Sequence, residues 1–199
     1  MDVIHTSSRG RMDCGCGHLN SFVFSHGFTL LELVVVLTVV SILLGLGAPS
    51  LGPFLSSERG LTRMNSLAGS LALTRSEAIK RNEHVVLCKS PDGQSCRRKG
   101  TGWHEGWIVF VDRDHDRRRQ DDEPILQHHG AGSAGQTLTY AAFGSRHYVT
   151  YRPSGMTRTN GTFTFCDPHY PDNARALILM KTGRVRSSRV KANGESLEC

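Results

Sequence analysis

The apolar positions of the chain form one continuous run, followed by a long region of mixed polarity. The run extends over residues 28–48, in which Glu32 is the only charged side chain. A helix of this length spans roughly 30 Å at about 1.5 Å per residue, which is the thickness of a bilayer core. The run therefore predicts a transmembrane helix. A removable signal peptide and a buried core helix are the alternatives, but the run is long for the first and apolar on too many faces for the second.

A second helix is predicted over residues 49–83, where apolar residues recur at helical spacing. These residues are Leu61, Met64, Leu67, Ala68, Leu71 and Ala78. Charged residues fall between them: Arg63, Arg75, Glu77 and Arg81. Glycine and proline over residues 45–53 predict a bend before this segment. We expect an amphipathic helix that presents one apolar stripe to a globular head.

The head, residues 84–199, has the pattern of a β-rich domain. Short β-branched and aromatic runs predict strands over 85–87, 106–111, 147–152, 162–165, 176–180 and 184–190. Asn160-Gly161 is a hairpin-turn signal, and Lys181-Thr182-Gly183 predicts a turn before the last strand. The predicted fold class is α+β, with a long N-terminal helix packed on an antiparallel sheet.

The start of the apolar run carries a specific motif. Gly27 followed by Phe28-Thr29-Leu30-Leu31-Glu32-Leu33 resembles the type III signal of type IV pilins and pseudopilins. Segments 75–82, 86–88, 106–112 and 182–186 are similar to the FimT/GspH group of minor pilins and pseudopilins. The resemblance covers about residues 25–190. It implies a pilin-like fold and a structural subunit of a fibre made of other pilins or pseudopilins, not an enzyme.

The resemblance also implies how the N-terminus is processed. A prepilin peptidase would cut between Gly27 and Phe28, remove residues 1–27 as a leader and methylate the new amine of Phe28. Met12 is an alternative start that would shorten the leader. Glu32 would lie beside the amine of a neighbouring subunit, which would give its carboxylate a cationic partner in apolar surroundings. The subunit would wait in the bacterial inner membrane, with its head in the periplasm, until an assembly platform moved it into a pilus or pseudopilus.

Cleavage would remove Cys14 and Cys16 and leave four cysteines. These are Cys88, Cys96, Cys166 and Cys199. An even number of cysteines in an exported domain predicts disulfides, with three possible pairings. We favour Cys88 with Cys96, around a short loop, and Cys166 with Cys199, which would tie the C-terminus to a strand. A zinc site built from the four thiolates is the alternative, although the spacing fits it poorly.

Charge distinguishes the last quarter of the chain from the rest. The 199 residues have a formal net charge of +6, and residues 146–199 hold nine Lys and Arg against four acidic residues. A strand that starts after Gly183 would place Arg184 and Arg186 on one face, about 6.6 Å apart, beside Lys181. Two guanidiniums at this spacing can grip successive phosphates. Arg189 and Lys191 would add electrostatic support. A solvated basic strand edge is the alternative.

The same residues strengthen the resemblance. Gly183-Arg184-Val185-Arg186 matches the GRxR motif that is associated with DNA binding during natural transformation in FimT-like minor pilins. The resemblance therefore implies a type IV minor pilin that binds DNA without sequence preference. An H-type pseudopilin of a type II secretion system, a structural subunit without DNA binding, is the alternative. A calcium-dependent or enzymatic head is a third hypothesis, which lacks a catalytic set of residues.

One acidic segment partly matches a calcium loop. Asp112, Asp114, Asp116 and Glu123 stand at positions 1, 3, 5 and 12 of such a loop. However, Arg117 stands where glycine is expected, two more arginines follow it, and strand-like residues flank the segment where an EF-hand has helices. We therefore predict a solvated hairpin tip without metal, with calcium as the weaker alternative.

Two other patterns are weaker still, and we predict no cofactor. Gly130-x-Gly132-x-x-Gly135 has the spacing of a dinucleotide fingerprint, but no strand is predicted directly before it. Neighbouring His128 and His129 cannot both face one metal from a regular element, and we interpret them as surface residues.

Overall fold

The computed structural model describes residues 28–47 and 51–199, and the chain divides into two units, Met1–Leu46 and Gly47–Cys199. Helix α1, Leu30–Gly47, lies in the first unit except for its last residue. Its first turn is capped by Thr29, whose Oγ1 accepts a hydrogen bond of 3.2 Å from the backbone N–H of Glu32. Within the described ranges, no helix reaches the length and hydropathy that a membrane crossing requires.

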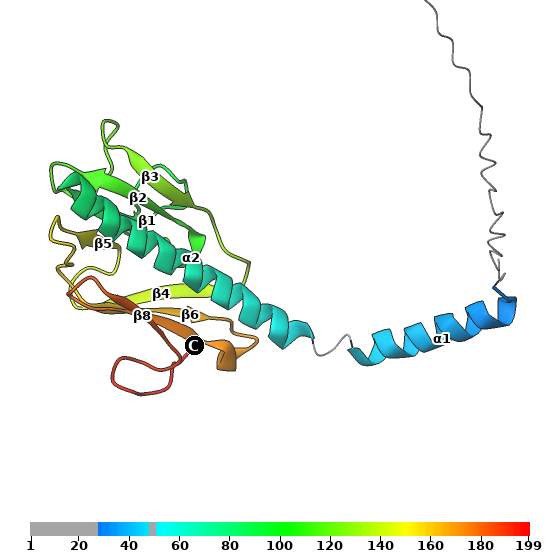
Figure 1. Ribbon diagram of the computed structural model, residues 1–199. Coiled ribbons are helices and arrows are strands. Elements are labelled where there is room, and N and C mark those ends of the chain that lie inside the picture. The colour runs from blue at the N-terminus through cyan, green and yellow to red at the C-terminus, as the bar shows by residue number, and fades with distance from the viewer. Residues whose placement is uncertain (1–27, 48–50) are drawn as a thin grey trace, which may run out of the picture. The chain divides into compact units, whose positions relative to one another are not determined.

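Helix α2, Leu51–Arg81, runs along the head (Figure 1). Met64, Leu67, Leu71 and Ala78 of the predicted stripe are buried. Leu61 was wrongly placed on the stripe and is 38% exposed. The buried row passes through Gly60 instead, because the Phe165 ring packs so closely there that a Cβ on residue 60 would lie 2.7 Å from its Cε1.

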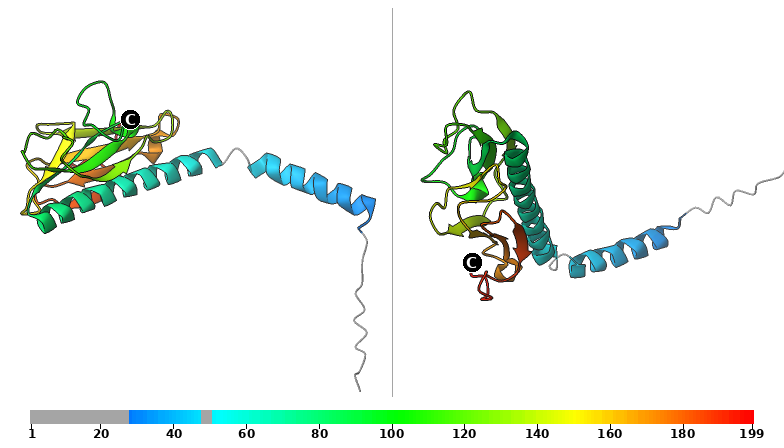
Figure 2. Two further views of the ribbon diagram at one scale, coloured as in Figure 1. Left: turned by 90° about the horizontal axis from the view of Figure 1, so that it is seen from above. Right: turned by 60° about the vertical axis from the view of Figure 1, so that its left-hand side comes forward.

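The head contains eight strands in two antiparallel sheets. They are β1 His84–Lys89, β2 Trp107–Asp112, β3 Ile125–His129, β4 Thr137–Ala142, β5 Tyr148–Tyr151, β6 Gly161–Cys166, β7 Arg175–Leu179 and β8 Val185–Ser188. The first sheet has the order β3-β2-β1-β5 and the second the order β4-β6-β7-β8. Helix α2 contacts strands of both sheets and lies along one side of the head (Figure 2). The α+β fold class is thus confirmed.

Three details differ from the predicted strands. β3 and β4 were not predicted at all. The hairpin predicted at Asn160-Gly161 does not form, because the strands on its two sides do not pair with each other. β5 pairs with β1, whereas β6 pairs with β4 and β7. The chain therefore changes sheets here, and Gly161 begins β6. The last strand begins at Val185 and ends at Ser188, so it is shorter than predicted.

The main core lies between α2 and the inner faces of the two sheets. Its aromatic centre is Phe163, which stacks on Tyr140 with ring centroids 4.1 Å apart and meets the edge of Trp103 at 5.0 Å. A smaller cluster of Val86, Cys88, Ile108 and Phe110 forms separately from the main core. Along β1 and β2 these residues alternate with those of the main core, so the first sheet is covered on both faces.

The burial of Phe163 gives a direct test of this core. We expect Phe163→Ala to lower the free energy of unfolding by about 3–5 kcal/mol, because the change leaves a cavity among aromatic rings. Phe143→Ala is the matched control, since Phe143 is 92% exposed and Phe163 is fully buried; it should change stability by less than about 0.5 kcal/mol. Urea unfolding of the full-length chain in detergent, followed by tryptophan fluorescence, measures both. Equal losses in the two variants would contradict this placement of the core.

Candidate functional site

The predicted basic strand lies at an edge of the second sheet. β8 pairs with β7 on one side, and the turn before it is closed by the Gly183 N–H, which donates to the Met180 carbonyl at 2.9 Å. Gly183 has φ of +79°, and a side chain at this position would collide with the carbonyl oxygen of Gly155. The turn therefore requires glycine, which fixes where the following residues begin.

Arg184 and Arg186 are both exposed on either side of half-buried Val185. Val185 packs against the main core, so the expected alternation is present. Arg184 precedes the strand, which differs from the prediction, and Arg186 pairs opposite Ile178 of β7. Arg189 is exposed just after the strand ends.

The tail cations differ in how they are paired. Over residues 51–199, no ion pair joins Lys181, Arg184, Arg186 or Arg189 to an acidic group. The Nζ of Lys191, in contrast, lies 3.1 Å from a Glu198 carboxylate oxygen and 3.5 Å from one of Glu195. The hydrogen bond to Glu198 raises the pKa of Lys191 above its usual value. The predicted supporting role of Lys191 is therefore weakened, because two acids already compensate its charge.

A further cation, Arg75 of α2, was not predicted for this site. A groove runs between α2 and β8, and Arg75, Arg184 and the Tyr151 ring line it. The Arg75 Nε would lie only 3.3 Å from a Cβ at Gly183, so its guanidinium lies against the turn. The sequence predicts only that Arg75 lies on the polar side of α2. Its closeness to Arg184 depends on how the helix packs on the sheet.

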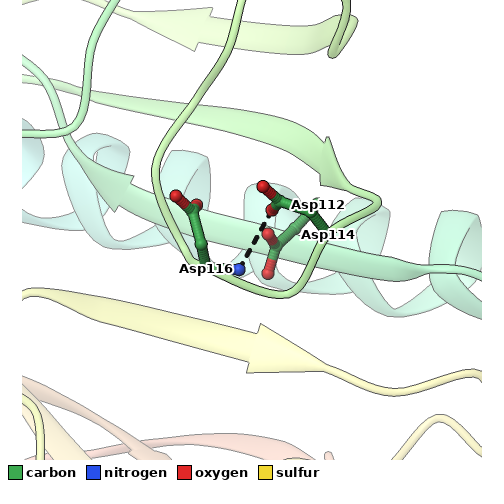
Figure 3. Close-up of side chains that lie close together, drawn as sticks. All are labelled: Asp112, Asp114 and Asp116. Atoms are coloured by element: carbon green, nitrogen blue, oxygen red, sulfur yellow. Dashed lines mark hydrogen bonds between the residues drawn. The ribbon is translucent and has the colours of Figure 1, made fainter.

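The acidic segment follows β2. Asp112 is the last residue of the strand, and Asp114 and Asp116 lie in the loop that leads to β3 (Figure 3). One carboxylate oxygen of each lies within 4.8 Å of those of the other two. Glu123, the predicted fourth ligand, does not belong to this group. It is buried and accepts hydrogen bonds from the backbone N–H groups of Arg113 at 2.8 Å and Gln120 at 3.1 Å.

The loop backbone turns at Arg117 in the way that glycine allows at this position of a calcium loop. Arg117 has φ of +61° in spite of its side chain, and its N–H donates to the Asp112 Oδ1 at 3.1 Å. Burial raises the pKa of Asp112, whereas a backbone hydrogen bond from Asp116 lowers the pKa of Asp114. The two neighbouring carboxylates thus differ strongly in their surroundings.

The remaining candidates have structural roles. β3 leads directly into the glycine-rich segment at 130–135, contrary to the prediction, but β4 follows it where a dinucleotide site needs a helix. His128 is exposed, whereas His129 is half-buried and stacks on Trp107 with centroids 5.0 Å apart, so the surface interpretation is wrong for His129. Burial lowers the pKa of His129.

The four head cysteines form two disulfides. Cys88 is joined to Cys96 and Cys166 to Cys199, which is the favoured pairing. The zinc alternative is therefore wrong, because it needs four free thiolates.

The residues predicted to be processed are only partly described. Gly27 and the leader lie outside the described residues. Phe28 is 85% exposed, and Glu32 is exposed in the first turn of α1.

Comparison with known proteins gives two family matches. Residues 63–190 match the model described as type II transport protein GspH, and residues 24–48 match the prokaryotic N-terminal methylation motif. A curated relative, the pilin-like protein PilA1 of Thermus thermophilus, is 36% identical over 108 residues. This match covers 54% of the chain and 62% of PilA1, less than two thirds of the relative's length.

Comparison with solved structures gives matches to proteins of two bacteria. The type IV minor pilin FimU of Pseudomonas aeruginosa is 19% identical, with a TM-score of 0.53 over 68% of this chain and 92% of FimU. The minor pseudopilin EpsH of Vibrio cholerae is 13% identical, with a TM-score of 0.47 over 65% of this chain and 96% of EpsH. The likeness to FimU concerns the fold, a helix followed by antiparallel sheets.

Proposed function

Because the chain belongs to the GspH family of type IV minor pilins and pseudopilins, we propose that it is a minor pilin of a type IV pilus that binds DNA through its basic edge strand. The family is structural, so the head serves as a displayed surface and not as a catalyst. The single observation that carries the DNA proposal is the exposed pair Arg184 and Arg186, which has no acidic partner in the described head.

The geometry of the basic edge allows contacts to phosphate groups. Arg184 and Arg186 are exposed and flank Val185, which packs against the core. Lys181 lies in the turn before them. A guanidinium can hold a phosphate through two parallel hydrogen bonds. Phosphate contacts carry no sequence information, so the proposed binding is non-specific and serves uptake in natural transformation. Arg75 extends the positive surface from β8 to α2.

The N-terminal methylation motif supports a proposed sequence of processing and assembly steps. Prepilin peptidase removes residues 1–27 and methylates Phe28, and residues 28–48 hold the chain in the inner membrane. Residues 49–83 then link this anchor to the head, residues 84–199, on the periplasmic side. The assembly platform moves the subunit into the fibre, where Glu32 pairs with the amine of a neighbour.

A pseudopilin of a type II secretion system is the second candidate. It is favoured by the description of the matching family model, type II transport protein GspH. The two candidates differ in what deletion of the chain abolishes. Loss of pili or of DNA uptake would support the pilus, whereas loss of protein secretion alone would support the pseudopilus.

The DNA proposal predicts a defined salt dependence. For the full-length chain in detergent, log K for duplex DNA should fall with log salt by about 0.9 per phosphate contacted. Arg184→Gln with Arg186→Gln should make this slope shallower by about 1.8, because two contacts are lost. Fluorescence anisotropy of a labelled duplex measures both quantities.

Arg97→Gln with Arg98→Gln is the matched control, because it removes the same charge from another exposed part of the head. This control should keep the slope of the unchanged protein. The DNA proposal fails if there is no binding at low salt, or if the two double variants have the same slope.

The proposed cleavage site gives a second prediction. Gly27→Ala should leave the precursor uncut at 21.9 kDa, because the peptidase would no longer meet the glycine before the scissile bond. Immunoblotting of membranes measures the shift, and Gly45→Ala, with open space around residue 45, serves as a control that should still be processed. A mature band in the Gly27→Ala strain would refute this cleavage site.

The proposed role of Glu32 gives a third prediction. Glu32→Val should enter the membrane at least as well as the unchanged chain, because the change removes a charge that is costly within a membrane. It should nevertheless be depleted at least about tenfold from fibres, because the neighbour's amine loses its partner. Thr38→Val is the control, since the Thr38 hydroxyl bonds the Val35 carbonyl of its own helix. Normal amounts of Glu32→Val in sheared fibres would exclude the amine pairing.

A further inference from the structure

A cluster of three carboxylates, at the end of β2 and in the loop that follows it, has no cationic partner in the described structure, and we propose that Asp112, Asp114 and Asp116 bind one calcium ion. The sequence pattern of this loop predicts a metal-free hairpin tip. The spacing of the carboxylate oxygens, the surroundings of Asp112 and the positions of the loop arginines favour a bound ion instead.

The spacing of the oxygens fits a single ion. One oxygen from each aspartate lies within 4.8 Å of the other two. Calcium holds its oxygen ligands at 2.3–2.6 Å, so two ligands of one ion can be separated by at most about 5 Å. Asp112 and Asp114 lie together where β2 enters the loop, and Asp116 lies across the loop from them (Figure 3).

Asp112 supplies an independent reason. Its side chain has 0% exposure, and its Oδ1 accepts the Arg117 N–H at 3.1 Å. Its Oδ2 is buried and has no hydrogen-bond partner among the described residues. A buried carboxylate oxygen without a partner is costly. A cation held by the three aspartates would satisfy this oxygen.

The arginines of the loop do not fill this role. Across residues 51–199, no ion pair joins Asp112, Asp114 or Asp116 to a lysine or arginine. The Arg113 Nε lies 3.4 Å from Glu83, and the Arg119 Nη1 lies 3.2 Å from Asp121.

Arg117 is engaged elsewhere as well. Its guanidinium carbon lies 5.8 Å from the centroid of the Tyr148 ring. The side chains of Arg113, Arg117 and Arg119 are thus directed toward other groups, and exposed Arg118 forms no ion pair with the three aspartates among the described residues.

The donor set indicates calcium among the common ions. All three donors are carboxylate oxygens, whereas structural zinc sites use mainly cysteine and histidine. Magnesium demands near-ideal octahedral geometry and keeps several waters, whereas calcium accepts irregular sets of six to eight oxygens. The loop is partly open, so water can complete the shell. We expect an affinity like that of extracellular modules, with Kd of about 10⁻⁴–10⁻³ M.

Calorimetry on the full-length chain in detergent, freed of metal by chelation, tests the site. Titration with calcium chloride should give about one ion per chain. Saturating calcium should also raise the melting temperature by a few degrees, because it binds only the folded loop. Magnesium chloride at the same concentration should bind at least about tenfold more weakly.

Asp114→Asn with Asp116→Asn should weaken calcium binding at least about tenfold and abolish the thermal shift. Asp114 is exposed and Asp116 half-buried, so the fold should persist, which circular dichroism checks. Should the double variant not fold, Asp114→Asn alone provides the test, with the same loss expected. Asp121→Asn with Asp122→Asn is the matched control, because it removes two exposed charges from the same loop outside the cluster. It should bind like the unchanged chain.

Three results would overturn the proposal: no calcium binding at 5 mM, unchanged binding after the loss of the Asp114 carboxylate, or equal losses in the two double variants. The last would mean a diffuse attraction of cations to an acidic loop.

Discussion

The architecture of the head depends on the burial of one face of α2 against two sheets. Leu67 and Leu71 are fully buried, and the helix contacts β1, β2 and β5 of one sheet and β6, β7 and β8 of the other. A four-stranded sheet needs a cover for its apolar face, and here a single helix covers two sheets at once. The hydrophobic effect supplies the attraction, and the apolar stripe sets which face of the helix turns toward the sheets.

Polar contacts add to the packing of this face. The Ser70 hydroxyl accepts from the Trp107 Nε1 at 2.9 Å, and the Arg63 guanidinium lies 4.1 Å from the centroid of the same indole. Nearer its start, the helix donates from Ser56 to the buried Asp167 at 2.7 Å. These bonds hold both sheets in register with α2, and the register in turn brings Arg75 to the turn before β8. The groove at the basic edge is therefore a consequence of the core.

Much of this could be predicted from the sequence, and the failures have physical causes. The helical period located α2, but Leu61 was misplaced because a glycine, not a leucine, meets Phe165. The two missed strands are weak local signals: β3 ends in two histidines, and β4 follows a glycine-rich loop. Asn160-Gly161 has turn chemistry, but a turn signal does not say which strands pair. Such pairings depend on contacts far apart in the chain.

The candidate site divides in the same way. Gly183 and its arginines were found because a turn and a strand period are local properties. Arg75 was missed because its closeness to Arg184 depends on a tertiary contact. The acids that compensate Lys191 lie only four and seven residues further along the chain, so this pairing was a local signal that the prediction did not use. The acidic loop was recognised from its spacing, but its interpretation depended on where the arginine side chains lie.

The bond between Cys166 and Cys199 has a consequence for the basic edge. It closes a loop with a sequence separation of 33 that contains all of β7 and β8. A cross-link of this span removes about 3–4 kcal/mol of chain entropy from the unfolded state in the simplest account. Edge strands fray readily, but here the chain after β8 is tied back to the end of β6, so β8 is tethered on both sides. The backbone around Arg184 and Arg186 is thus ordered when the protein folds and the disulfide forms. A ligand at this edge would not have to order it again.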